Sequence, residues 1–315
     1  MKSSPQVSIA ILAALSQASA QFGLASNTPP QTQTEPTKSA IDHLVLAGDF
    51  TVEGVMNDEP VKLIVEPVAP DRPVLNPEFV RMHGLSGSFI TGSFNFGAMK
   101  LKAHTKVLKY EFSGQKWKRR SLWTDRPYSE EHAGAVGVQG IPHKKITFHL
   151  RPSQGDEQRF VFPLAKNGQS FDKEIGGKQV EIGFTLRRDH TLASAAAGSV
   201  LAEEFGGTFS PERFKQEIAF GVERPIQRLQ LQESFFFAGR SLGQIYVRTR
   251  DWGDVSGIKK HEKVEGDPSE IVVAAKAKKG GKARYSITIG RDDLAHCSTM
   301  TFDKKSEEII LYCSA

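Results

Sequence analysis

A pattern of short apolar strands and short helices occurs twice along the chain. Residues 61–65 and 180–184 are apolar at alternating or consecutive positions and rich in β-branched side chains, which predicts β-strands. Each strand leads into a short irregular turn, a second apolar step and a short amphipathic helix, expected over 77–83 and 194–204. Glycines directly after both helices end them. The chain therefore contains a faint internal repeat of strand, turn, strand and helix.

Composition and length support a mainly β architecture. The chain has 315 residues, enough for two domains that each bury a core. Glycine and proline are frequent, helix-like runs are few, and short stretches rich in Val, Ile, Phe and Thr dominate.

The N-terminal residues have the pattern of an export signal. Residues 1–20 combine a basic start, a short apolar run and an Ala-Ser-Ala end, which is typical of a secretory signal peptide. Residues 21–40 are polar and rich in proline, and we expect them to form a disordered linker. No segment is apolar enough to cross a membrane. The expected location is periplasmic or secreted.

The two cysteines lie on either side of a predicted hairpin. Cys297 and Cys313 are equally distant from residue 305, the centre of a polar turn, so the hairpin brings them opposite each other. In an exported protein this pairing predicts a disulfide. We expect no metal site, because two thiols without histidine ligands are too few. No cofactor is expected either, since the glycines at 134, 137 and 140 do not form a dinucleotide fingerprint.

Charge gives no strong indication of a nucleic-acid partner. The formal net charge is +5, and basic residues cluster at 116–120 and 276–282. The first cluster includes Trp117, a mixture found in nucleic-acid-binding surfaces. Acidic residues are spread throughout, however, and we interpret the clusters as solvated loops of a protein that binds no nucleic acid.

The repeat resembles the core of the retropepsin-like and pepsin-like aspartic proteases. In that family each lobe carries an Asp-Thr/Ser-Gly turn, and each closes with a hydrophobic-hydrophobic-Gly segment before a final hairpin. Residues 134–142 and 285–294 match the closing segments, and Ile289-Gly290-Arg291-Asp292-Asp293-Leu294 is similar to a pattern of bacterial members. The resemblance implies two β-barrel lobes, 41–166 and 174–315, with a cleft that one monomer can form. The second lobe is expected to hold an insertion between 207 and 285.

Neither turn carries the aspartate that the resemblance leads one to expect. Glu66 stands at the first aspartate position and Thr185 at the second. The family mechanism needs two carboxylates that share one proton, one acting as base and one as acid. Pro67 and Leu186 replace the hydroxyl residues that would bond across the turns. That mechanism cannot operate with these residues.

Two substitute pairs stay open from the sequence. Asp71 and Asp189 follow closely after the two turns and could meet as a non-standard carboxylate pair. Glu66 and Arg187 could instead form a charge-neutralised structural contact. A Gly-x-Ser-x-Gly pattern at 239–243 resembles a nucleophile elbow, but a strand rather than a helix is predicted after it.

The sequence therefore predicts a catalytically inactive protein whose inter-lobe cleft binds a peptide or protein partner. An extended peptide could bind by adding a strand to the β lobes. The alternatives are a divergent aspartic-type peptidase and a structural envelope protein without a ligand.

Overall fold

The fold, taken from a computed structural model, is mainly β, as the sequence predicts, and the described residues belong to one compact unit. The expected signal peptide, the linker and the basic run 276–282 lie outside the described residues. The structure describes residues 42–96, 99–129, 131–249 and 283–314.

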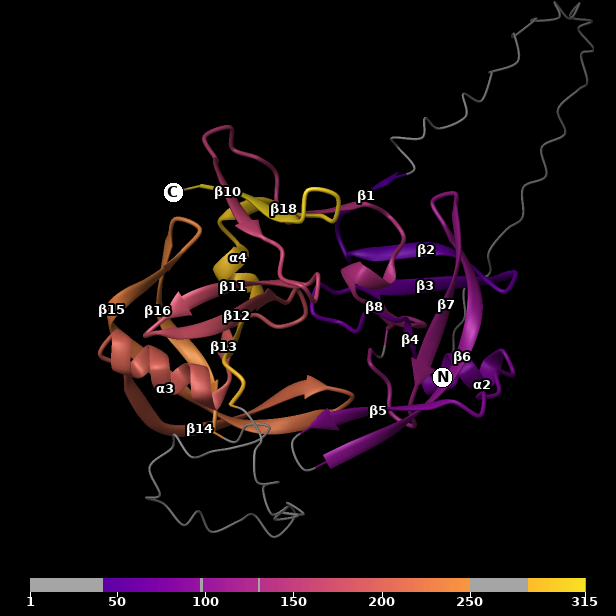
Figure 1. Ribbon diagram of the computed structural model, residues 1–315, viewed down its shortest axis with the longest axis horizontal. Helices are drawn as coiled ribbons and strands as arrows, with labels where there is room; N and C mark the ends of the chain where they lie inside the picture. Colours follow the sequence, from indigo (N-terminus) through magenta and orange to yellow (C-terminus); the bar gives the residue numbers. More distant parts are fainter. Residues whose placement is uncertain (1–41, 97–98, 130, 250–282, 315) are drawn as a thin grey trace, which may run out of the picture. The chain divides into compact units, whose positions relative to one another are not determined.

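The first sheet has the spatial strand order β2-β3-β8-β4-β7-β6-β5 and is drawn in indigo to magenta in Figure 1. An additional pairing of β2 with β6 closes six of its strands into a β-barrel. Within the described part of the chain, β5 pairs only with β6 and so forms an open edge. The short helix α2 (Pro77–Met82) follows β4. The strands are β2 (Thr51–Met56), β3 (Glu59–Val65), β4 (Val74–Leu75), β5 (Thr91–Phe96), β6 (Met99–Phe112), β7 (Gln115–Trp123) and β8 (Gly134–Val136).

The second sheet has the order β11-β12-β17-β13-β16-β15-β14, with β14 at its open edge among the described strands. Helix α3 (Ala195–Glu204) follows β13, as α2 follows β4 (Figure 1). The strands are β11 (Ser170–Ile175), β12 (Lys178–Phe184), β13 (Leu192–Ala193), β14 (Thr208–Ala219), β15 (Val222–Phe237), β16 (Arg240–Arg248) and β17 (Ser286–Ile289).

The two sheets are assembled by the same sequence of pairings. Each starts with an antiparallel hairpin whose second strand runs parallel to the last strand of the set. Each set also contains a two-residue strand, β4 in the first sheet and β13 in the second. This strand pairs antiparallel with the last strand of its set (β8 or β17) and parallel with the next-to-last strand (β7 or β16). We call the two sets the first repeat (residues 51–136) and the second repeat (residues 170–289). The repeat suggested by residues 61–65 and 180–184 is thus a duplication of seven strands.

This correspondence bears on the insertion expected between Gly207 and Tyr285. Strands β14, β15 and β16 occupy the same places in the second sheet as β5, β6 and β7 in the first. They are therefore counterparts of strands in the first repeat. Residues 250–282, which complete the interval, lie outside the described residues.

A third sheet joins the two repeats. Its order is β1-β9-β18-β19-β10, and its centre is the antiparallel pairing of β9, which follows the first repeat, with β18, which follows the second. The short helices η1 (Val138–Gly140) and α4 (Arg291–Leu294) precede β9 and β18. The strands are β1 (His43–Leu46), β9 (Lys145–His149), β10 (Gln158–Pro163), β18 (Cys297–Asp303) and β19 (Glu308–Cys313).

Local sequence explains why these elements form where they do. In β3 the side chains of Val61, Leu63 and Val65 alternate into the core and are at most 4% exposed. Helix α3 begins where the Ser194 side chain accepts a hydrogen bond from the Ala197 N–H at 3.1 Å, a normal N-cap.

The basic cluster at 116–120 forms part of a strand, which corrects the expected loop. It lies on β7, where Trp117 packs against Tyr110 with ring centroids 5.4 Å apart. Lys116 forms an ion pair with Glu111, and Arg119 donates to Asp71. Lys116 and Lys118 are exposed on either side of the half-buried Trp117, as the alternation of side chains along a strand requires.

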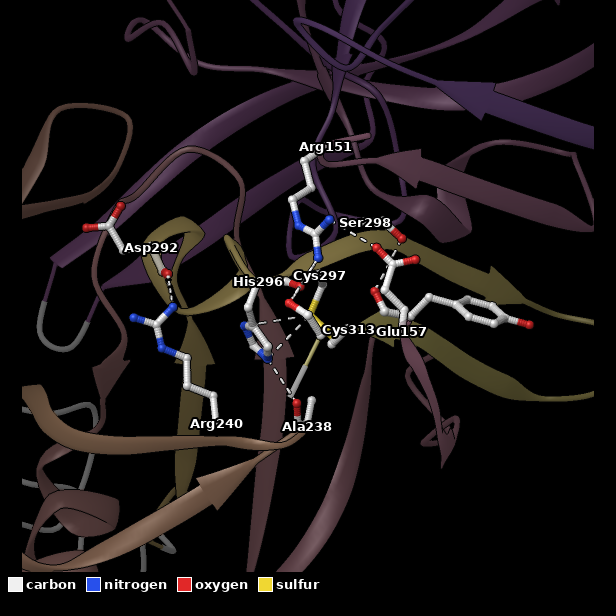
Figure 2. The surroundings of a disulfide bond; sticks show 11 residues. Arg151, Glu157, Ala238, Arg240, Asp292, His296, Cys297, Ser298 and Cys313 are labelled. Atoms are coloured by element: carbon white, nitrogen blue, oxygen red, sulfur yellow. Dashed lines mark hydrogen bonds and ion pairs between the residues drawn. A yellow bond between two sulfur atoms is a disulfide. The ribbon is translucent and has the colours of Figure 1, made fainter. Parts of the chain in front are cut away.

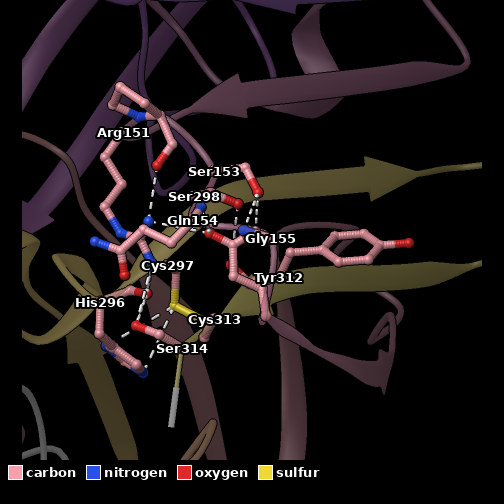
Figure 3. Close-up of polar contacts among 12 residues, drawn as sticks. Arg151, Ser153, Gln154, Gly155, His296, Cys297, Ser298, Tyr312, Cys313 and Ser314 are labelled. Carbon is pink, nitrogen blue, oxygen red and sulfur yellow. Dashed lines mark hydrogen bonds and ion pairs between the residues drawn. A yellow bond between two sulfur atoms is a disulfide. The ribbon is translucent and has the colours of Figure 1, made fainter.

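Cys297 and Cys313 form the predicted disulfide between β18 and β19, and both are fully buried. Figures 2 and 3 show the polar contacts around it. Arg151 donates to the His296 carbonyl at 2.5 Å and pairs with Glu157 at 3.0 Å. These contacts fix the loop after β9 to the strand that carries Cys297.

One histidine lies closer to the cysteines than the sequence analysis assumed. A ring nitrogen of His296 and the two cysteine sulfurs lie within 4.8 Å of one another. Both sulfurs are used in the disulfide, so neither is a thiolate that could bind a metal. The His296 ring bonds instead to the Ala238 carbonyl at 2.9 Å (Figure 2).

Replacing both cysteines by alanine should lower the free energy of unfolding by about 3 kcal/mol, because the disulfide closes a loop of about 15 residues. Urea unfolding of the wild type and of Cys297→Ala/Cys313→Ala measures this difference. A reductant serves as the control, since it should destabilise only the wild type. Equal stability of the two proteins would show that the disulfide adds nothing.

Candidate functional site

The turns that follow β3 and β12 occupy equivalent places in the two repeats. The Glu66 N–H donates to the Val136 carbonyl at 3.1 Å, at the end of β8. The Thr185 N–H donates to the Ile289 carbonyl at 2.9 Å, at the end of β17. Since β8 and β17 correspond, Glu66 and Thr185 are structurally equivalent residues.

A glycine supports each turn at close range. A Cβ on Gly137 would lie 2.2 Å from the Ala69 carbonyl oxygen, and one on Gly290 would lie 2.4 Å from the Asp189 carbonyl oxygen. Neither position has room for a side chain, because the backbone atoms that would be displaced belong to the turns. The hydrophobic-hydrophobic-Gly segments therefore hold the turns.

A hydrogen bond from a backbone N–H to a side chain connects the two turns. The Leu186 N–H of the second turn donates to Glu66 Oε2 of the first at 3.1 Å. Glu66, Thr185 and Leu186 are all buried, with exposed fractions of 1%, 3% and 6%. A carboxylate is thus present on one side of this junction, and a threonine stands at the equivalent place on the other.

Burial dominates the electrostatics of Glu66. It raises the pKa of the carboxyl from 4.5 to about 6, although the Thr185 hydroxyl, the Leu186 N–H and two arginines act in the opposite direction. Oε1 is buried and has no well-placed hydrogen-bond partner among the described residues. The protonated form of Glu66 is therefore more favoured at this site than it would be for a glutamate exposed to water.

Tyr128 and Arg187 lie beside this carboxyl. The Arg187 guanidinium lies over the Tyr128 ring, 4.7 Å from its centroid. Burial, together with the charge of Glu66, raises the pKa of Tyr128 to about 12, so the phenol is neutral at pH 7. Arg187 therefore stacks on Tyr128, and its positive charge lowers the pKa of Glu66 against the larger effect of burial.

Asp71 and Asp189, the other candidate carboxylates, are both exposed. Asp71 bonds to Arg119 at 3.1 Å and lies 3.7 Å from Arg72. Asp189 bonds to Arg291. Their side chains are 54% and 57% exposed, so each carboxylate is solvated and has its own arginine.

A cavity of about 410 Å³ lies next to the junction and is lined by both repeats. Val68 and Tyr128 of its wall also line a smaller cavity of about 120 Å³, whose wall includes Glu66 and Thr185. The edge strands contribute too, β5 through Ser93 and Phe94 and β14 through Ile218 and Ala219.

The hairpin β14–β15 extends from the second repeat onto the first. Phe220 at its tip is 2% exposed, and its ring lies 4.6 Å from that of Phe94 and 5.3 Å from that of Tyr128. Residues 216–218 of the same hairpin line the smaller cavity. The hairpin therefore forms part of the wall of both cavities, and its tip packs against the first repeat.

Sequence reasoning missed several of these residues. Tyr128 lies in an irregular segment between β7 and β8, and Phe220 lies in a hairpin turn, so no periodic pattern marks either residue. Arg248 ends β16 and lines the larger cavity. The exposed Gly-x-Ser-x-Gly serine, Ser241, lies within β16 opposite Phe236, in the strand that its flanking residues predict.

Comparison with known proteins gives little support for an assignment. No protein-family model matches the chain, and no curated protein matches it. Among solved structures, the EIAV protease complexed with the inhibitor HBY-793 matches at 19% identity and a TM-score of 0.22. That match covers 28% of this chain and 79% of the other. It is a weak likeness to a retroviral protease and carries no weight for fold or function.

Among the described residues, no helix combines the length and the apolar character needed to span a membrane.

Glu66→Gln should make the protein more stable at pH 7 and remove part of its pH dependence. Because the pKa of Glu66 is raised to about 6, the folded protein binds more protons than the unfolded chain between about pH 4.5 and 6. The stability contributed by the protonated acid is present below this range and is lost as the pH rises, by about 2 kcal/mol.

The measurement is urea unfolding of the wild type and Glu66→Gln from about pH 4 to pH 7. Glu233→Gln, at an exposed position of β15, is the control and should follow the wild type. If the difference between the wild type and Glu66→Gln is independent of pH, Glu66 does not titrate as described.

Proposed function

We propose that this chain is an exported, aspartic-protease-like protein that binds an extended peptide segment and does not cleave it. Its two lobes are 41–166 and 174–315, and the larger cavity is part of the cleft between them. The observation that carries the proposal is the junction of the two turns, where Glu66 faces the Leu186 N–H and Thr185 occupies the equivalent place. The disulfide is compatible with an oxidising compartment.

The junction supports the absence of aspartic-type catalysis. That chemistry requires two carboxylates close enough to share a proton. Glu66 has only a threonine as its structural equivalent, and burial keeps its side chain from solvent. Asp71 and Asp189 are exposed and bonded to Arg119 and Arg291. Neither Glu66 nor the pair Asp71 and Asp189 therefore offers two adjacent carboxyls that could share a proton.

The open sheet edges support a peptide as the ligand. Both β5 and β14 are edge strands among the described elements, and both line the larger cavity. An extended peptide can bond to the free N–H and C=O groups of such an edge, and side-chain pockets then select its residues. A cavity of about 410 Å³ is within the range of ligand pockets.

The competing function is a divergent peptidase that acts through Glu66. Its pKa, raised to about 6, is in the range of a general acid or base, and Glu66 lines the smaller cavity. A cleavage assay distinguishes the two functions.

We expect no cleavage of denatured casein by the wild type at any pH from about 3 to 7, because the carboxylate pair is missing. Mass spectrometry of the products after long incubation is the measurement. Glu66→Gln, Asp71→Asn and Asp189→Asn are run in parallel and should give the same result. Cleavage by the wild type that one of these variants abolishes would establish the peptidase instead.

A tryptophan at Ser93 should weaken peptide binding at least about tenfold, because it fills the cavity beside the open edge of β5. The probe is a pool of neutral decapeptides of mixed sequence with blocked ends and a neutral fluorescent label, and the measurement is fluorescence anisotropy. Thr91→Trp, two residues earlier on the same strand and also exposed, is the matched control. Equal binding by both variants and the wild type would place the peptide elsewhere.

A further inference from the structure

We propose that protonation of His143 releases residues 141–144 from the turn between β18 and β19. This segment connects η1, which follows the first repeat, to β9 in the third sheet. Acid therefore loosens the joint between the first repeat and the third sheet. The joint is separate from the two cavities described above, and the inference does not depend on the identity of a ligand.

His143 is buried without a hydrogen-bond partner. The exposed fraction of the residue is 0%, and neither ring nitrogen has a partner among the described residues. A neutral imidazole carries one N–H group, whereas an imidazolium carries two N–H groups and a positive charge. A charge that is buried without paired groups is strongly unfavourable. Protonation of His143 therefore costs free energy for as long as the surrounding chain keeps the ring out of water.

Lys304, in the turn between β18 and β19, holds the segment on both sides of His143. Its Nζ donates to the Ile141 carbonyl at 2.6 Å, and its backbone N–H donates to the Lys144 carbonyl at 2.8 Å. The Lys144 N–H in turn donates to the Asp42 carbonyl at 2.9 Å, just before β1. These hydrogen bonds fix the chain around the ring, and we expect the ring to reach water only when they break.

The charges around the ring add to the effect of burial. Burial lowers the pKa of His143 to about 4, and the charges of Lys304 and His43 lower it further. Asp42 raises this pKa, but the Asp42 carboxylate is itself paired with the Lys144 ammonium at 2.6 Å. A second positive charge is therefore unfavourable at this place.

Lys304 is the strongest charge that acts on the ring. Burial lowers the pKa of Lys304 to about 8, and the charge of Arg119 lowers it further, so Lys304 is mostly protonated at pH 7 and fully protonated in acid. The other groups at the joint have partners of their own. Asp303 forms an ion pair with Lys145 at 3.0 Å, and the His43 ring bonds to a threonine hydroxyl of β9 at 2.9 Å. Protonation of the buried ring therefore sets two cations against each other across the hydrogen bonds that hold the segment.

The direction of the pH effect follows from the two states of the segment. The pKa of His143 is about 4 when the segment is in place and returns to the ordinary value of 6.5 when it is released. Between these values the released segment binds more protons than the folded one. The free energy that holds the segment is therefore fully present above about pH 6.5 and is lost as the pH falls toward 4. This dependence is opposite to that of Glu66.

Hydrogen exchange of single amides measures the release. We expect the protection factors of the Lys144 and Lys304 amides to fall at least about tenfold from about pH 7 to pH 5, because this range lies mostly between the two pKa values. The Glu181 amide, which donates to the Tyr285 carbonyl at 3.0 Å in the second repeat, is the internal reference. Unchanged protection of Lys144 and Lys304 would overturn the inference. An equal loss at Glu181 would also overturn it, because acid would then act on the whole fold.

His143→Leu removes the titrating ring and should keep both amides protected at pH 5. His149→Gln, at the exposed end of β9, is the matched control and should lose protection as the wild type does. If His143→Leu loses protection to the same extent as the wild type, His143 is not the group that responds to acid.

NMR titration of the imidazole rings in the wild type tests the same claim without a variant. We expect a pKa of about 4 for His143. A pKa of 6.5 or above would show that the ring is protonated without cost in the folded protein, and would refute the release.

Discussion

The position of the two repeats relative to each other depends on the pairing of β9 with β18. Each strand follows its own repeat, and their antiparallel register runs from Lys145 opposite Asp303 to His149 opposite Thr299. The short helices η1 and α4 connect β8 to β9 and β17 to β18. The turns after β3 and β12 are bonded to the ends of β8 and β17, so the pairing of β9 with β18 also brings these two turns together. The hydrogen bond from Leu186 to Glu66 is the result of that placement.

The repeats keep the same construction while their turns differ in chemistry. Gly137 and Gly290 pack against the turns at distances that exclude any side chain, and the backbone bonds of Glu66 and Thr185 are equivalent. The side chains placed on this common frame are a buried acid on one side and a threonine followed by arginines on the other. A junction that is symmetric in its backbone is therefore asymmetric in its chemistry, because a carboxyl stands on one side and a threonine stands at the equivalent place on the other.

The local elements of both repeats could be predicted from the sequence, because short-range rules determine them. Alternating apolar residues marked β3, and short amphipathic runs ended by glycines marked α2 and α3. The cysteine spacing predicted the disulfide because a hairpin pairs residues at equal distances from its turn. Glu66 and Thr185 were located by their place after the two strands. Those signals act within a few residues.

The rest of the site depends on contacts between distant residues. Phe220 and Tyr128 meet across the two repeats, and neither lies in a periodic segment. Arg248 enters the cavity because β16 runs parallel to β13, a pairing that no local pattern specifies. The seven-strand order of the second sheet was hidden for the same reason, and its strands β14 to β16 looked like an insertion.

At the junction of the two turns, the Glu66 carboxyl stands without a second carboxyl among the described residues of either turn that could share its proton. NMR titration of the carboxyl carbons measures this directly. We predict that Glu66 titrates in a single step with a pKa of about 6. This pKa should be the same in the wild type, in Asp71→Asn and in Asp189→Asn. A two-step titration of Glu66, coupled to a carboxyl of the second repeat as in a proton-sharing pair, would contradict it.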